Sequence, residues 1–109
     1  MKLEIANFTS ALDGKHFDKW HLFNIDESDS MYTFKARNKP HSQKADIDCI
    51  AILVTINRYP NEDGKYGVAV AYKEYSNRIY LGYHTKEQIR SKVLFFRDIT
   101  NIIDKYENR

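Results

Sequence analysis

The sequence predicts an α+β fold in which an antiparallel meander of five to six strands packs against one long C-terminal helix. Polar turn segments separate short apolar runs through the first 84 residues, as is typical of a meander. Residues Thr85 to Gln88 then match a helix capping box, and apolar residues follow at spacings of three and four. The chain has 109 residues, 42% of them apolar, which suffices for one core. We expect one domain, 1–109, with N-terminal strands in 1–45, a three-stranded meander in 46–84 and the helix in 85–107.

The first half of the chain predicts three strands and a loop. Leu3–Phe8 alternates weakly between apolar and polar residues, and Asp13-Gly14 after it is a turn signal. His16–Ile25 and Met31–Ala36 are rich in strand-forming residues and are joined by a polar turn. Asn38–Lys44 is wholly polar and contains a proline, so we expect an exposed loop, whose ordering on binding stays an open question.

The second half predicts three strands in meander order. Asp48–Arg58 is the strongest strand signal, because apolar side chains occupy both of its faces. Turn chemistry at Pro60–Gly64 separates it from the strand Lys65–Tyr75, and Ser76-Asn77 separates that strand from Arg78–His84.

The helix has the clearest signals. Thr85 is the expected N-cap, because its hydroxyl can accept one free amide while the Gln88 side chain reaches back to another. An apolar stripe follows and should cover one face of the last three strands. The stripe comprises Ile89, Val93, Phe96, Ile99, Ile103 and Tyr106.

Alternation divides the last predicted strand between two faces. We expect the helix-facing set to be Ile79, Leu81 and Tyr83. The set on the opposite face is Arg78, Tyr80, Gly82 and His84, with a shallow spot at the glycine.

Charge alone favours no class of partner. Seventeen basic and fifteen acidic residues give a net charge of +2, far below the excess found in proteins held mainly by phosphate contacts. The halves differ slightly: residues 1–50 carry seven Lys/Arg and eight Asp/Glu, and residues 51–109 carry ten and seven. No apolar run approaches the roughly 20 residues of a membrane span, and no secretory signal is expected. The single cysteine, Cys49, fits a buried thiol in a reducing cytoplasm.

No pattern indicates catalysis, so we expect no enzyme, no catalytic residue, no metal and no cofactor. The four histidines are not spaced as ligands, and the four glycines form no phosphate loop. Asp46 and Asp48 would point the same way from a strand, but surface solvation explains them as well.

Tyrosines cluster in the second half, interleaved with basic residues. Flat aromatic rings beside basic groups can stack on bases and contact phosphates, and they also suit protein interfaces. High strand propensity explains tyrosine there equally well. The cluster comprises Tyr66, Tyr72, Tyr75, Tyr80 and Tyr83, with Lys65, Lys73, Arg78 and His84 between them.

Residues 54–98 resemble the three-strand-plus-helix DNA-binding domain of plant ethylene-response factors and of integrase arm-binding domains. The closest stretch is Arg78-Ile79-Tyr80-Leu81-Gly82-Tyr83-His84-Thr85-Lys86-Glu87-Gln88, which is similar to that family's last strand and the start of its helix. The resemblance implies that the sheet face away from the helix contacts the major groove. By position it assigns contacts to Lys73, Arg78 and Tyr80, with Arg58 and Tyr72.

Our first hypothesis is a small non-enzymatic binding protein that contacts nucleic acid or a nucleic-acid-binding protein. Its expected site is Arg58, Tyr72, Lys73, Arg78, Tyr80 and His84. The alternative is a stoichiometric inhibitor of a host defence system such as a CRISPR nuclease, encoded by a phage or mobile element, whose AT-rich genomes favour this Lys-, Asn-, Ile- and Tyr-rich composition. A small nuclease using Asp46, Asp48 or His84 is the most distant alternative. A homodimer through an edge strand is also open, because edge pairing is cheap for a meander.

Overall fold

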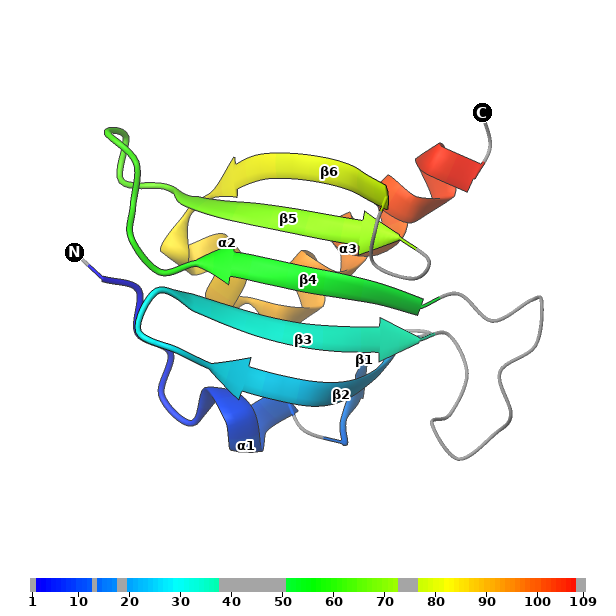
Figure 1. The fold of residues 1–109 in the computed structure, drawn as a ribbon, viewed down its shortest axis with the longest axis horizontal. Coiled ribbons are helices and arrows are strands. Elements are labelled where there is room, and N and C mark those ends of the chain that lie inside the picture. The colour runs from blue at the N-terminus through cyan, green and yellow to red at the C-terminus, as the bar shows by residue number, and fades with distance from the viewer. Residues whose placement is uncertain (1, 13, 18–19, 38–50, 73–76, 108–109) are drawn as a thin grey trace.

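The computed structural model describes residues 2–12, 14–17, 20–37, 51–72 and 77–107. Within them, six antiparallel strands form one sheet in the order β1-β2-β3-β4-β5-β6, so neighbours in the chain are neighbours in the sheet. The strands are β1 (His16–Phe17), β2 (Trp20–Glu27), β3 (Met31–Arg37), β4 (Ala51–Asn57), β5 (Tyr66–Tyr72) and β6 (Asn77–His84). The helices are α1 (Phe8–Leu12), α2 (Lys86–Arg90) and α3 (Lys92–Glu107). Figure 1 shows the sheet in front and α2 and α3 behind it.

The α+β class and the antiparallel meander are therefore confirmed, and two expectations for the first 25 residues are wrong. Leu3–Phe8 forms no strand; instead the short helix α1 begins at Phe8. Phe8 and Leu12 are four residues apart on one face of that helix and are both buried, and the Phe8 ring stacks on Tyr32 at 4.0 Å. His16–Ile25 holds two strands, β1 and the start of β2, in place of one.

The single long helix is also a wrong expectation, because the chain breaks helical geometry at Ser91. That residue has ψ 85°, and it separates α2 from α3. The capping box is confirmed: the Gln88 amide donates to the Thr85 hydroxyl at 3.1 Å, and the Thr85 amide donates to the Gln88 side chain at 2.8 Å. Of the predicted apolar stripe, Ile89 on α2 and Phe96, Ile99 and Ile103 on α3 are buried, and the side chains of Val93 and Tyr106 lie outside what the structure describes.

The core lies between the helices and one face of the sheet. Phe96 on α3 packs beside Phe34 on β3, with ring centroids 5.6 Å apart. The Trp20 indole is fully buried and donates to the Thr100 hydroxyl at 2.9 Å, which ties β2 to α3. Side chains from four strands and both ends of the chain complete this layer. The largest fully buried ones are Trp20, Tyr32, Phe34, Phe96, Leu3, Ile52, Ile56, Ile99, Ile103, Val54, Val68 and Val70.

Several expectations lie outside the described residues. They concern the Asn38–Lys44 loop, the buried Cys49 thiol, the acidic pair at 46 and 48, and the predicted contact Lys73. Within the described residues, no helix is both long enough and apolar enough to cross a membrane.

Candidate binding surface on the open face of the sheet

One face of the sheet carries the helices, and we call the other the open face. Paired residues in an antiparallel sheet share a face, so the strand register assigns each side chain to one side. On β5, Tyr66, Val68, Val70 and Tyr72 are buried under the helices. The positions between them, Gly67, Ala69 and Ala71, lie on the open face and are all small.

The predicted faces of β6 are reversed beyond its bulge. Val70 pairs with Tyr80 but Ala71 pairs with Arg78, so Ile79 is an extra residue opposite β5. Beyond this bulge, Leu81 pairs with Ala69 and Tyr83 with Gly67, which places both on the open face, each 57% exposed. The expectation that Leu81 and Tyr83 face the helix is wrong.

Tyr80 and His84 lie on the helix side, so their assignment to an exposed binding face is also wrong. The Tyr80 hydroxyl is 2.9 Å from His84 Nε2, and the imidazole packs edge-on against Phe95 of α3. Burial lowers the pKa of His84, and a smaller effect of the Asp98 carboxylate opposes it. Burial also raises the pKa of Tyr80, with a smaller contribution from Asp98.

The shallow spot expected at Gly82 is filled. Gly82 pairs with Val68, on the helix side, and a Cβ there would collide with the Tyr80 phenol that passes over it. The absent side chain therefore lets Tyr80 reach His84 along the same strand.

Arg58 and Tyr72 are buried as well, so they do not form the predicted contact surface. Arg58 is only 7% exposed, and its guanidinium donates to the carbonyls of Leu3 at 3.0 Å and Ser28 at 2.5 Å. It also lies over the Tyr32 ring, 4.4 Å from the centroid. Arg58 therefore fastens the N-terminal segment and the β2–β3 turn to the end of β4.

Of the six predicted contacts, Arg78 alone is exposed on the open face within the described chain. The register places it in one row with Ala71 and Leu53 and, across the sheet, with Lys35. Arg37 lies two residues beyond Lys35 on the same face. We call Lys35, Arg37 and Arg78 the basic end.

The other half of the open face is hollowed. Thr55, Gly67 and Ala69 form a floor of small side chains on β4 and β5, and the hollow holds about 340 Å³. It lies where β4 and β6 end and β3 and β5 begin (Figure 1). We call it the open-face trough. Its walls are Met31 and Tyr59 on one side and Leu81 and Tyr83 on the other, with Asn57, Pro60 and Asn61 at its end.

Hydrogen bonds fix the Tyr59 wall. The Tyr59 hydroxyl donates to Asp29 at 2.9 Å, and Lys2 forms a 3.0 Å ion pair with the same carboxylate. The hydrogen bond to Asp29 raises the pKa of Tyr59, and the one from Lys2 lowers the pKa of Asp29. Since the Tyr59 amide also donates to Asn57, the ring is held in place although it is 48% exposed.

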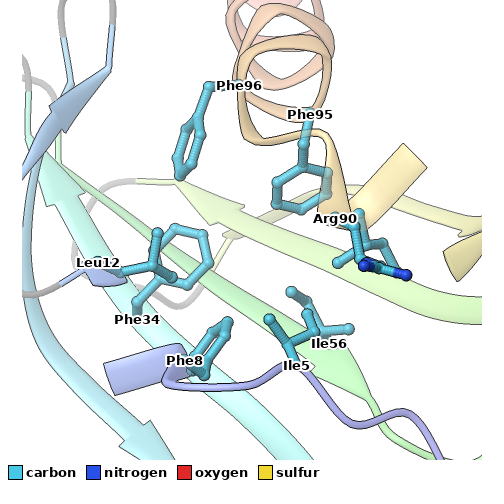
Figure 2. Close-up of a pocket in the computed structure, with 9 residues that line it drawn as sticks. Ile5, Phe8, Leu12, Phe34, Ile56, Arg90, Phe95 and Phe96 are labelled. Atoms are coloured by element: carbon cyan, nitrogen blue, oxygen red, sulfur yellow. The ribbon is translucent and has the colours of Figure 1, made fainter. Parts of the chain in front are cut away.

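A second cavity, on the helix face, is a packing gap. Figure 2 shows Phe95 and Phe96 of α3 on one side of it and Leu12 and Phe8 of α1 on the other. It holds about 20 Å³, so it has room for roughly one water, and all of its lining residues except Arg90 are apolar. Its lining is Ile5, Phe8, Leu12, Phe34, Ile56, Ile89, Arg90, Phe95 and Phe96.

No group of three or more His, Cys, Asp or Glu residues in the part of the chain that the structure describes could hold a metal ion. No family model, curated protein or solved structure matches this chain, so the resemblance to the ethylene-response-factor domain stays a prediction.

Sequence reasoning missed most of the trough. Met31, Tyr59, Leu81 and the Gly67 floor were not expected to form a site. A signal was present in β5, where small residues alternate with large ones. Alternate residues share a face, so one face of this strand carries only small side chains and leaves space above the sheet.

Proposed function

We propose that this protein is a small non-enzymatic binding protein that docks a partner protein on the open face of its sheet. The observation that carries the proposal is the open-face trough, whose apolar walls are exposed while its floor is small. Large side chains in water, gathered around a hollow, mark interaction sites more often than isolated ones do. A stoichiometric inhibitor, as considered from the sequence, is one form such a protein takes.

The trough is suited to a protein partner by its composition. Tyr and Met are enriched at protein interfaces, and Leu81, Tyr83, Met31 and Tyr59 surround a space that an inserted apolar side chain would fill. Because Tyr59 is already held by Asp29, little conformational freedom is lost on binding.

Nucleic acid is the second candidate, and one observation favours it. Arg78 and Lys35 lie in the same row of the open face, where they could contact phosphates. Four of the six residues expected to make that contact are instead buried or turned to the helices: Arg58, Tyr72, Tyr80 and His84.

Capture experiments with a plugged trough test the proposal. A Cβ at position 67 would lie 3.7 Å from the Tyr83 ring, an ordinary contact, so Gly67→Leu should fill the trough and leave the fold intact. When the immobilised protein is incubated with nuclease-treated lysate of the source organism, the wild type should retain one partner protein at equal stoichiometry. The Gly67→Leu variant should retain none. The control is Arg97→Glu, an exposed change on α3, which should capture normally.

The outcome decides between the candidates. If the Gly67→Leu variant still captures the partner protein, the trough is not the binding site. A mobility shift of single-stranded DNA or RNA at low salt, lost in Arg78→Glu, would replace the protein partner by nucleic acid.

A further inference from the structure

The trough continues as a groove along β5. Its floor is the row of small side chains Gly67, Ala69 and Ala71, and larger side chains of the neighbouring strands stand beside it: Leu53 on β4, and Arg78, Leu81 and Tyr83 on β6. Those flanking strands are two strand spacings apart, roughly 10 Å, which is close to the diameter of a helix with its side chains, about 10 to 12 Å. The groove therefore has the width of one helix.

A partner lying on this face cannot use the backbone of the sheet. The hydrogen bonds of a sheet run in its plane, so an extended segment on the face would bury its own amides and carbonyls unpaired. A helix satisfies those groups internally. The occupant that fits the groove is consequently helical.

The two ends of the groove differ in chemistry. At one end, Leu81 and Tyr83 border the apolar trough. At the other end lie Lys35, Arg37 and Arg78; among the described strand residues, the register places the acidic Asp26 on the same face, opposite Thr33. From Gly67 to Ala71 the ends are about 13 Å apart, which is about nine residues of helix.

We infer that the partner presents an amphipathic helix along β5, with an apolar side chain in the open-face trough and carboxylates at the basic end. This inference rests on the proposed function and specifies its partner. The trough supplies the anchor, and the cations select acidic helices and repel basic ones. The orientation follows as well, because only one direction of the helix places acid on the cations.

Peptide selection tests this inference without knowledge of the natural partner. A displayed library of helix-forming peptides of about 16 residues, roughly 24 Å long, is selected on the whole chain. Enriched peptides should carry an apolar residue and, about seven or eight residues away on the same face of the helix, Asp or Glu. Their binding is then measured by fluorescence anisotropy on four proteins: wild type, Gly67→Leu, Arg78→Glu and Arg97→Glu.

Gly67→Leu should abolish binding. Arg78→Glu should weaken it on the order of tenfold, while Arg97→Glu on the other layer should leave it unchanged. Exchanging the peptide's acids for Lys should weaken its binding to the wild type, because the basic end repels the new charges. Raising ionic strength from about 50 mM to about 500 mM should weaken the wild-type complex because the charges are screened.

The failures are distinguishable. Peptides that need Gly67 but ignore Arg78→Glu would overturn the acidic chemistry and leave the proposed function standing. Bound peptides without a helical circular dichroism signal would overturn the helix. If no peptide depends on Gly67, both proposals fail. If an oligonucleotide alone binds in a Gly67-dependent way, the partner is nucleic acid.

Discussion

The two faces of the sheet come from the same alternating strands, yet they differ in side-chain size. Under the helices, β5 presents Val68, Val70 and Tyr72, and on the open face it presents Gly67, Ala69 and Ala71. β6 shows the converse, because its large Leu81 and Tyr83 stand in water while Gly82 lies beneath the Tyr80 phenol. The small open face of β5 therefore lies beside large, exposed side chains of β6, and this difference in size hollows the open face.

The largest expected effect sharpens this contrast between core and surface. Phe96→Ala should lower the free energy of unfolding by about 3 to 5 kcal/mol, because Phe96 is 2% exposed and packs on Phe34. Leu81→Ala should change it by less than about 0.5 kcal/mol. Urea melts measure both. Similar losses in the two variants would mean that the open face is part of the core.

The sequence predicts that Arg58 and Arg78 belong to one contact surface, but Arg58 is buried and Arg78 is exposed. Arg58→Met should cost about 2 to 3 kcal/mol, because the carbonyls of Leu3 and Ser28 lose a buried charged donor. Arg78→Met, at the exposed position, should cost less than about 0.5 kcal/mol. Thermal melts of both variants check this. If Arg58→Met melts like the wild type, its guanidinium does not fasten the N-terminal segment.

Local signals in the sequence predicted the elements that local chemistry determines. Thr85 and Gln88 cap α2 as expected, because a capping box involves only four consecutive residues. The turn at Pro60–Gly64 likewise lies between β4 and β5, where its residue types predict it. The buried positions Phe96, Ile99 and Ile103 follow from helical spacing alone.

The binding surface was harder to predict because it depends on distant contacts. Arg58 meets partners 55 and 30 residues away, so nothing near it in sequence indicates burial. The bulge at Ile79 reverses every later side chain of β6, and alternation cannot detect one extra residue. The break at Ser91 similarly interrupts a helical pattern that continues on both sides.

Two glycines on neighbouring strands should respond to the same change with opposite sign. Gly82→Ala should destabilise by about 1 to 3 kcal/mol, because the new methyl displaces the Tyr80 phenol from His84. Gly67→Ala should stabilise by about 0.4 to 1 kcal/mol, because its Cβ meets only ordinary contacts and the unfolded chain loses freedom. Chemical denaturation of both variants tests the sign. Destabilisation by Gly67→Ala would show that the open face has no free space there.

The smallest expected effect is the pH dependence of stability that His84, on the helix face of the sheet, contributes. His84 has a lowered pKa because burial disfavours its charged form, and the Asp98 carboxylate only partly offsets this. Its other neighbours, the Tyr80 hydroxyl and the Phe95 ring, carry no charge at neutral pH. As pH falls below the ordinary value of 6.5, the unfolded chain takes up a proton before the folded chain does. Stability should therefore be complete above that value and decline until the lower folded pKa is passed.

Replacement of His84 isolates this contribution from those of the carboxylates. In His84→Gln, whose amide can still accept from Tyr80, the free energy of unfolding should vary less between about pH 7.5 and about pH 5 than in the wild type. The slope is the measurement that matters, because the lost imidazole packing shifts stability equally at every pH. If His84→Gln has the same slope as the wild type, the titrating group lies elsewhere. If the stability of the wild type rises as pH falls, the folded state favours the charged imidazole.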